Sequence, residues 1–224
     1  MHVTIIQTFT IYILPILFAI TLHEAAHGYI ALKLGDKTAL MLGRVTLNPL
    51  KHIDPLGTVI VPILMFLLSY SLTSVPFIFG WAKPVPVTWQ NLKHPRRDMA
   101  LVALAGPVAN LLMLLLWAAL AKIAMLTANS MPYSLAELII LMGRAGIIFN
   151  AIIMILNLLP IPPLDGSRVI SSILPPRWSY YYSLLEPYGF FIILIMIPTG
   201  ILFAIMRPML SLVLQLVQLI FGNI

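Results

Sequence analysis

The segment from Val3 to Leu32 is almost entirely apolar, yet it contains the pentad His23-Glu24-Ala25-Ala26-His27. A bilayer crossing needs about 20 helical residues, so this run is long enough to span with length to spare. Two tyrosines aside, the pentad holds the only ionisable side chains of the segment. An ionisable group at membrane depth is costly and by default marks a functional site. The sequence therefore predicts a membrane helix that carries a buried chemical site.

The spacing within the pentad is typical of a zinc site. His23 and His27 are four positions apart, so on a helix both imidazoles project from one face, one turn apart. Two nitrogen ligands of one tetrahedral zinc ion need this arrangement. Glu24, beside the first histidine, can reach a water on such a metal and accept its proton. The HExxH pattern also arises by chance in soluble helices, but the apolar surroundings favour the catalytic interpretation here.

Composition indicates an integral membrane protein. Hydrophobic residues make up 61% of the chain and charged residues 9%, and the mean hydropathy is +1.02, whereas soluble proteins carry about 25% charged residues. The net charge of +6 comes from lysines and arginines in the loops, which favours contact with anionic lipid over binding of nucleic acid. The chain has no cysteine, so disulfides and thiolate ligands are excluded.

Four further apolar segments follow the first one, at 56–80, 99–126, 134–159 and 180–222. We therefore expect an all-α polytopic membrane protein with about five to six transmembrane helices, folded as a single membrane-embedded domain over residues 1–224. The last segment is long enough for two helices, with the break at Pro198-Thr199-Gly200 or at Arg207-Pro208; the first of these is the stronger turn signal. No hydrophilic stretch is long enough for a PDZ or nucleotide-binding domain.

A third metal ligand has to come from outside the pentad. The candidates near the membrane are His2, His52, Asp54, His94, Glu137, Asp165 and Glu186. Asp165 stands out because it follows the proline-rich break Pro160-Ile161-Pro162-Pro163, and irregular backbone at membrane depth survives only where it is buried or lines a cavity. It can complete a His₂Asp site that leaves a fourth position open. The structural alternative is a helix-ending turn with an Asp-Gly pair at the interface.

Three separated motifs resemble those of the site-2 protease family of intramembrane zinc metalloproteases. They are the pentad, Gly106-Pro107-Val108-Ala109-Asn110, and the segment from Asn157 to Gly166. The likeness covers residues 18–170 and weakens after about residue 185, in the C-terminal helices expected over 180–222. It is closest to small bacterial or archaeal members without a PDZ domain. The stretches Leu47–Pro49, His52–Gly57 and Gly80–Val87 also match that subgroup.

The resemblance implies hydrolysis of a peptide bond within or beside a transmembrane helix of a substrate. It implies one Zn²⁺ per chain with His23, His27 and Asp165 as the ligands and Glu24 as the general base. Asn157 matches a family position that helps to hold substrate near the metal. The implied partner is a single-span membrane protein or a remnant signal peptide, reached through the lipid bilayer.

The remaining polar residues of the apolar segments have competing interpretations. For Asn157, donation to the substrate carbonyl is favoured over an interhelical hydrogen bond. For Asn110 and Asn150, helix packing is favoured, and substrate contact by Asn110 is the alternative. His52 lies among loop charges, which favours an interfacial position over ligation. Asp54 precedes a proline and is expected to cap a helix.

Crossing parity predicts the topology. His23 and Asp165 each lie toward the C-terminal end of an apolar segment, so the two helices must run parallel to reach one ion. Only an odd number of crossings can connect them, so one of the segments 56–80 and 99–126 does not cross. Basic residues flank 56–80 on both sides, and the positive-inside bias places both flanks on one side. We predict that 56–80 is re-entrant or a tight hairpin, with the zinc nearer the cytoplasmic face of the cell membrane.

A helical substrate hides its peptide bonds, so cleavage requires an extended segment. Thr38–Leu47 and Lys83–Trp89 have β-branched or alternating apolar character, which favours short strands at the membrane edge that pair with an unwound substrate. Pro84 and Pro86 restrict the second stretch to an edge. Interfacial loops are the alternative for both.

Two other functional classes fit parts of the sequence. A metal transporter would need acidic and histidine residues along a path through the bilayer, whereas Glu24 and Asp165 converge on one depth. A catalytically inactive membrane scaffold would have no use for Glu24, which is not a ligand. Both features favour a protease.

Overall fold

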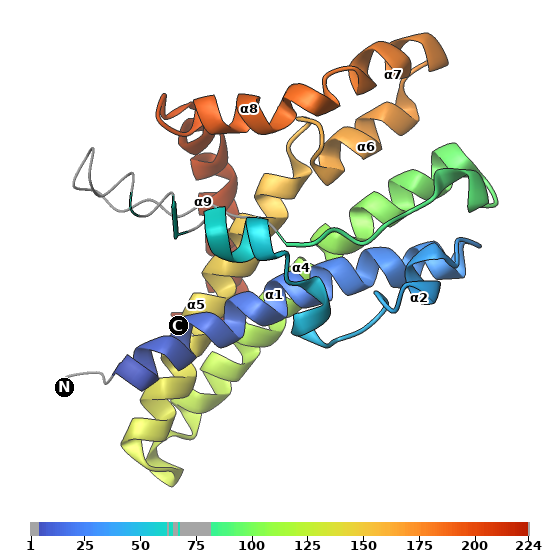
Figure 1. Ribbon diagram of the computed structural model, residues 1–224. Coiled ribbons are helices and arrows are strands. Elements are labelled where there is room, and N and C mark those ends of the chain that lie inside the picture. Colours follow the sequence, from blue (N-terminus) through green and yellow to red (C-terminus); the bar gives the residue numbers. More distant parts are fainter. Residues whose placement is uncertain (1–4, 62, 65–66, 68–81, 224) are drawn as a thin grey trace.

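The computed structural model describes residues 5–61, 63, 64, 67 and 82–223 (Figure 1). The long helices are α1 (Ile5–Lys33), α4 (Pro95–Leu126), α5 (Tyr133–Leu158) and α9 (Ile201–Phe221). The shorter ones are α2 (Thr38–Met41), α6 (Asp165–Ile173), α7 (Pro176–Ser183) and α8 (Glu186–Met196). Single helical turns occur at Pro49–His52, Pro55–Ile60, Trp89–Asn91 and Ala128–Ser130.

In the described part of the chain, the four long helices are apolar enough to cross a membrane. The all-α polytopic architecture is therefore confirmed, but the count differs from the expected five to six. One reason is α8, which has 11 residues and is about 17 Å long, roughly half the thickness of a hydrocarbon core. The other is segment 56–80, most of which lies outside the described residues, so its expected hairpin or re-entrant form is not described.

The C-terminal segment breaks where the turn signal is stronger. Helix α8 ends at Met196, and Gly200 precedes α9 with φ of +74°, a left-handed conformation that glycine adopts without steric cost. Pro208, the alternative break, lies inside α9. The expectation of a break at Pro198-Thr199-Gly200 is confirmed.

Neither stretch expected to form an edge strand does so. The first begins with the short helix α2 and turns at Gly43, where φ is +63°. The second, Lys83–Trp89, forms no strand in the described chain: Ala82–Thr88 runs as an extended backbone outside any helix (Figure 1), and Trp89 begins a helical turn. Pro84 and Pro86 have no N–H to donate to a ladder, and the N–H groups of Val85 and Thr88 donate to carboxylates. The edge-strand prediction is wrong for the described residues.

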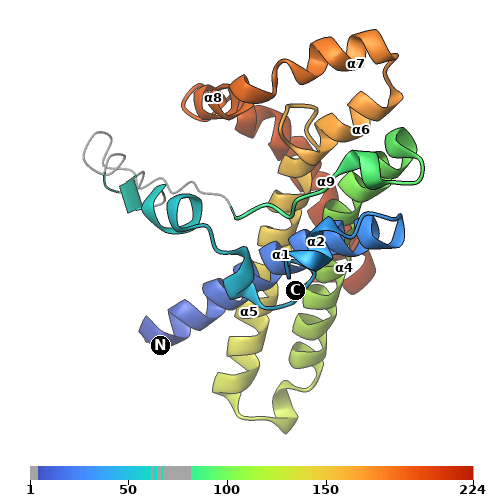
Figure 2. The same ribbon diagram turned by 45° about the vertical axis from the view of Figure 1, so that its right-hand side comes forward.

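Helices α4 and α5 form a close antiparallel hairpin (Figure 2). Two glycines of α5 permit this approach: a Cβ at Gly143 would lie 2.6 Å from the Cβ of Ala121, and one at Gly146 would lie 2.5 Å from the ring of Trp117. Small residues at such contacts let helix backbones pack tightly in a membrane. The core around Trp117 also includes Val217 of α9.

Helix α1 packs against α4 in the antiparallel sense too. His23 contacts Asn110 and His27 contacts Val102, so residue numbers rise along α1 in the direction in which they fall along α4. Because α4 is antiparallel to both neighbours, α1 and α5 are parallel, as the crossing argument predicted. The connection between α1 and α4 also starts and ends on one side of the bundle, since the N–H of Lys93 donates to the Leu34 carbonyl at 3.1 Å.

Candidate metal centre

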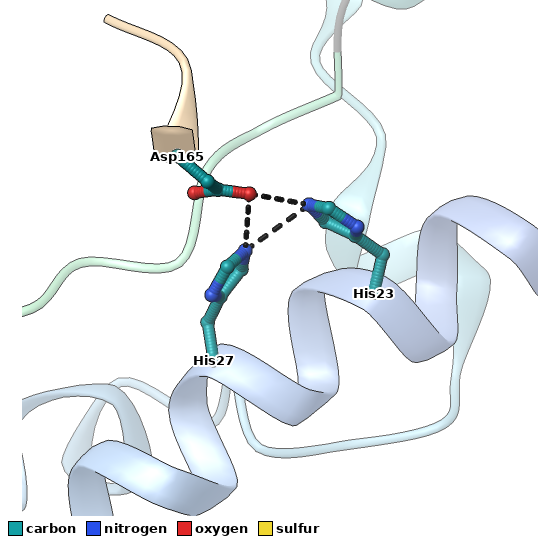
Figure 3. A group of neighbouring side chains, drawn as sticks. All are labelled: His23, His27 and Asp165. Atoms are coloured by element: carbon teal, nitrogen blue, oxygen red, sulfur yellow. Dashed lines mark hydrogen bonds and ion pairs between the residues drawn. The ribbon is translucent and has the colours of Figure 1, made fainter. Parts of the chain in front are cut away.

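The three ligands that the sequence predicted converge on one point. His23 and His27 extend from one face of α1, and Asp165 approaches from the first residue of α6 (Figure 3). The Nε2 atoms of the two histidines are 3.1 Å apart. The Oδ2 atom of Asp165 lies 3.2 Å from Nε2 of His23 and 3.3 Å from Nε2 of His27. Both histidines are buried, at 5% and 8% exposure.

Helix α4 fixes the tautomer of both histidines. Nδ1 of His27 lies 2.7 Å from the backbone carbonyl oxygen of Val102, which can only accept, so Nδ1 carries the proton. Nδ1 of His23 lies 2.6 Å from Oδ1 of Asn110. The amide nitrogen of Asn110 donates to Ala19 O and Asn150 Oδ1, so its oxygen is the atom that accepts from His23. In the neutral imidazoles both Nε2 atoms then present lone pairs toward Asp165.

This arrangement fits a bound cation. Two nitrogen lone pairs and a carboxylate oxygen face one another at hydrogen-bond distance, and Oδ2 of Asp165 is buried without a hydrogen-bond partner. A positive charge between them would turn that repulsion into attraction. Zinc binds histidine nitrogen and carboxylate oxygen at about 2.0–2.2 Å, so ligand atoms on a zinc tetrahedron lie about 3.3–3.5 Å apart. The observed separations are close to that value.

Asn110 supports His23 from behind. Its side chain is fully buried and links three helices, through Ala19 of α1, Asn150 of α5 and the imidazole of His23. Asn150 continues the network by donating to the Gly146 carbonyl. Metal-binding histidines commonly use such outer partners to hold the ring. The structure places Asn110 at this packing contact, and its amide is already engaged there rather than turned toward a substrate.

Gly106 makes room for the two imidazoles. A Cβ at this position would lie 2.6 Å from Nε2 and Cε1 of His23, so no larger residue fits without displacing a ligand. The closest contacts of Gly106 are the imidazoles of the centre, a role that spacing along the chain does not reveal.

Asp165 is delivered by a tight junction between α5 and α6. The chain leaves α5 at Leu158, passes the cis peptide bond between Pro162 and Pro163, and begins α6 at Asp165. At Gly166 a Cβ would lie 2.6 Å from the Leu159 carbonyl oxygen, so glycine lets α6 start directly beside the end of α5.

Glu24 is half-buried on α1 beside the ligands. Its Oε2 atom accepts a hydrogen bond from the N–H of Val85 at 2.8 Å, which ties it to the extended stretch Ala82–Thr88. Asn157 lies near the end of α5 and donates to the Ile153 carbonyl of its own helix at 3.0 Å. Because the amide carries two N–H groups, this bond leaves the second one for the expected donation to substrate.

Of the other candidate ligands, His2 lies outside the described residues, and none of the rest joins the three proposed ligands. His52 is buried and is not a ligand candidate here, and its Nε2 lies 3.0 Å from the Thr46 carbonyl oxygen; its interfacial position stays a prediction. Asp54 caps the turn at Pro55–Ile60 by accepting from the N–H groups of Leu56 and Gly57, as expected. In the described part of the chain, His23, His27 and Asp165 are the one group placed to share a metal ion.

Sequence reasoning missed Asp36, which holds the extended stretch to the end of α1. Its buried carboxylate accepts from the backbone N–H and hydroxyl of Thr38, the N–H of Thr88 and the amide of Asn91. Burial alone would raise the pKa of this carboxyl, but these hydrogen bonds lower it below its ordinary value. An Asp-Lys-Thr sequence after a helix is a common turn signal, so nothing marked this residue in advance.

Comparison with known proteins agrees with this class of site, a histidine–aspartate metal centre inside a helical membrane bundle. The chain is 34% identical to a Bacillus subtilis protein named "Putative zinc metalloprotease YwhC" over 199 residues, which are 89% of this chain and 85% of that protein. It is 30% identical to "Putative zinc metalloprotease Rip2" of Mycolicibacterium smegmatis over 184 residues, covering 82% of this chain and 64% of that one. The Rip2 protein of Mycobacterium tuberculosis is 29% identical over 165 residues.

The chain belongs to the site-2 protease family of zinc metalloproteases. The names of its relatives support a metalloprotease that uses zinc. The chain spans a little under two thirds of the length of the M. smegmatis Rip2 protein that it matches. No family profile matches the chain, and no solved structure matches it.

Proposed function

We propose that this protein is an intramembrane protease that hydrolyses a peptide bond within or beside a transmembrane helix of a membrane protein. One observation carries the proposal: the metal-binding atoms of His23, His27 and Asp165 converge between helices that are apolar enough to span a bilayer. A site buried at that position is reached most directly by a polypeptide that is itself in the membrane.

The chain's own residues have distinct roles in this reaction. His23, His27 and Asp165 would hold the zinc ion, which when bound acts as a Lewis acid and lowers the pKa of a water from about 15.7 to about 7. Glu24 accepts the proton of the attacking water and returns it to the departing amine. Asn157 donates its amide to the scissile carbonyl, where loss of one such donor costs about 10²–10³ in rate in other enzymes.

The hydrogen bond between Glu24 and Val85 supports the role of Glu24. A single backbone donor fixes the direction of the carboxylate and leaves its second oxygen for a water. The contact also places the extended backbone of Ala82–Thr88 next to the proposed base, where an unwound substrate has to lie.

The substrate we propose is a single-span membrane protein or a remnant signal peptide. The protein is proposed to lie in the cell membrane with the metal centre nearer the cytoplasmic side. The charges at one end of the bundle support the orientation: Lys33 ends α1, Lys37 follows it, and Arg96 and Arg97 lie in the first turn of α4.

An inactive scaffold is the second candidate, and cleavage separates the two. Protein purified with zinc should cleave at least one member of a panel of single-span substrates in proteoliposomes, and mass spectrometry of the products should locate the cut in or beside the transmembrane segment. Glu24→Gln should retain one zinc per chain and lose turnover by at least about 10²-fold, the usual contribution of a general base. Undiminished cleavage by Glu24→Gln would remove this residue from its role, and zinc binding without cleavage of any substrate would favour the scaffold.

A further inference from the structure

A cavity of about 650 Å³ opens beside the metal centre. It lies between the start of α4, α6 and α7, where both views place α6 above the N-terminal end of α4 (Figures 1 and 2). Its walls include the guanidinium groups of Arg96 and Arg168 and the hydroxyl groups of Ser167, Ser171, Ser172 and Ser179. None of the proposed metal ligands lines it.

Helix α6 links the centre to the cavity, because Ser167 and Arg168 of the lining follow Asp165 directly on this helix. Asp165, Arg168 and Ser172 have the i, i+3, i+7 spacing that shares one face of a helix. Arg168 is therefore about 5 Å further along the axis than the ligand, and Ser172 about 10 Å. On the opposite wall, Val87 belongs to the extended stretch that contacts Glu24 through Val85. A chain leaving the metal centre along this stretch reaches the cavity.

The charge of the cavity is unbalanced. In the described chain neither guanidinium forms an ion pair with a carboxylate: Arg96 donates to the Leu174 carbonyl, and Nη1 of Arg168 lies 3.9 Å from the sulfur of Met99. Glu186 is the one carboxylate among the described residues of the lining. Two arginines against a single acid leave an excess of positive charge, and the serine hydroxyls of the lining are neutral groups bonded to Leu164 O, to Val169 O or to one another. A guanidinium pairs with carboxylates in bidentate geometry.

We propose that this cavity binds an acidic side chain of the substrate, an aspartate or glutamate about two to three residues from the scissile bond. The estimate assumes an extended chain at about 3.3 Å per residue over the distance of about 5–10 Å that separates Asp165 from Arg168 and Ser172 along α6. This inference rests on the proposed function and adds a rule of substrate choice to it. Membrane helices usually carry basic residues at this kind of flank, so the cavity would select substrates that break that pattern.

The test uses one transmembrane substrate with three versions of its flanking segment, acidic (Asp/Glu), neutral (Asn/Gln) and basic (Lys). With zinc-loaded wild type in neutral-lipid proteoliposomes, kcat/KM for the acidic version should exceed that for the neutral one by about five- to tenfold, the size expected of two partly exposed ion pairs. The difference should lie mainly in KM. Arg168→Gln should reduce the acidic-to-neutral ratio to about two- to threefold, because Arg96 remains in the lining, and Arg168→Glu should lower it further.

Arg97→Gln is the matched control. Arg97 is the exposed neighbour of Arg96 on α4 and does not line the cavity, so this variant should keep the wild-type ratio. Equal loss of the ratio in Arg97→Gln and Arg168→Gln would overturn the proposal, because general surface charge would then explain the preference.

A binding measurement separates this inference from the protease function. Zinc-loaded Glu24→Gln should bind the fluorescently labelled acidic substrate about five- to tenfold more tightly than the neutral one. That result without any cleavage by wild type would support the cavity while refuting the protease. Cleavage of all three versions at one rate would refute the cavity alone. A rate that follows the anionic-lipid content of the vesicles and ignores substrate charge would also overturn it, because the cavity would then bind a lipid headgroup.

Discussion

The two halves of this molecule differ in how tightly they pack. In the most apolar stretch of α5, 44% of the residues are buried within the protein, whereas in α9 the value is 11%. The first half, α1 with α4 and α5, is joined by small residues and by the buried polar network of Asn110 and Asn150. The second half, α7 to α9, shows large apolar side chains on its outside, such as Phe203 and Leu219. Close packing is concentrated where the proposed metal ligands are held.

This difference follows from the solvent. In hydrocarbon, apolar side chains gain little by leaving lipid for protein, so helices associate through close packing and polar contacts. The α1–α4–α5 unit has both features, and α9 has few of either. Variants in the first unit should therefore change metal binding and activity, and variants on α9 should change little.

The largest effect is expected at the ligands. His23→Ala, His27→Ala and Asp165→Ala should each lose bound zinc together with activity, because two protein ligands hold zinc poorly. Zinc is measured by elemental analysis of the purified variants. Glu137→Gln, an acidic residue of α5 outside the centre, is the control and should keep one zinc per chain. Full occupancy in Asp165→Ala would mean that the third ligand is another residue.

A smaller effect is expected one contact away from the metal. Asn110→Leu removes the acceptor for Nδ1 of His23 and should weaken zinc binding by about 10–100-fold, the usual range for an outer partner of a ligand. Asn110→Asp keeps an oxygen at that position and should restore much of the affinity. Competition with a chelator gives the affinities. If Asn110→Leu binds zinc as tightly as wild type, the close packing of α1 against α4 alone suffices to orient His23.

The proposed ligands and the residues that contact them differ in how far the sequence could predict them. The pentad has a fixed spacing on a helix, so its shared face follows from periodicity, and Asp165 was found because three prolines before it cannot continue a helix. The functions of Asn110 and Gly106 depend on which helix packs against α1 and at what height, and a single sequence does not contain that register. Hydropathy measures apolar length, so it did not show that α8, with 11 residues, is too short to cross a bilayer.

A still smaller effect on activity is expected at Asp36, which anchors the extended stretch next to Glu24. Asp36→Asn should loosen that stretch, raise backbone hydrogen exchange at Val85 and Thr88, and lower the rate by a few-fold while zinc stays bound. Hydrogen bonds to a charged group contribute about 1.5–3 kcal/mol when buried and less when partly solvated.

The sign of the pH dependence at Asp36 follows from its lowered pKa. A carboxyl whose folded pKa lies below its unfolded value, about 3.9, stabilises the fold fully above that value and loses the contribution as the pH falls through the folded pKa. Between about pH 6 and pH 8 the carboxyl is ionised in both the folded and the unfolded state, so the thermal midpoint of wild type should exceed that of Asp36→Asn by a constant amount. The two midpoints should converge in acid below about pH 4. A difference that persists unchanged in acid would show that the charge of Asp36 is not what anchors the stretch.

The smallest effect on stability is expected for variants of α9, and two leucine-to-alanine variants, one in the core and one on α9, allow the comparison. Leu114 of α4 is 1% exposed and lies in the core around Trp117, whereas Leu219 of α9 is 82% exposed. Leu114→Ala leaves a cavity between helices, a change that costs about 2–5 kcal/mol in soluble cores, and we expect the lower end here because lipid replaces water as the reference. The Leu219 side chain faces lipid in the folded protein, so Leu219→Ala leaves no cavity between helices. Its thermal midpoint and zinc content should match wild type. If Leu219→Ala were as destabilising as Leu114→Ala, α9 would be packed against protein in the membrane, and the contrast between the two halves would belong to the isolated chain alone.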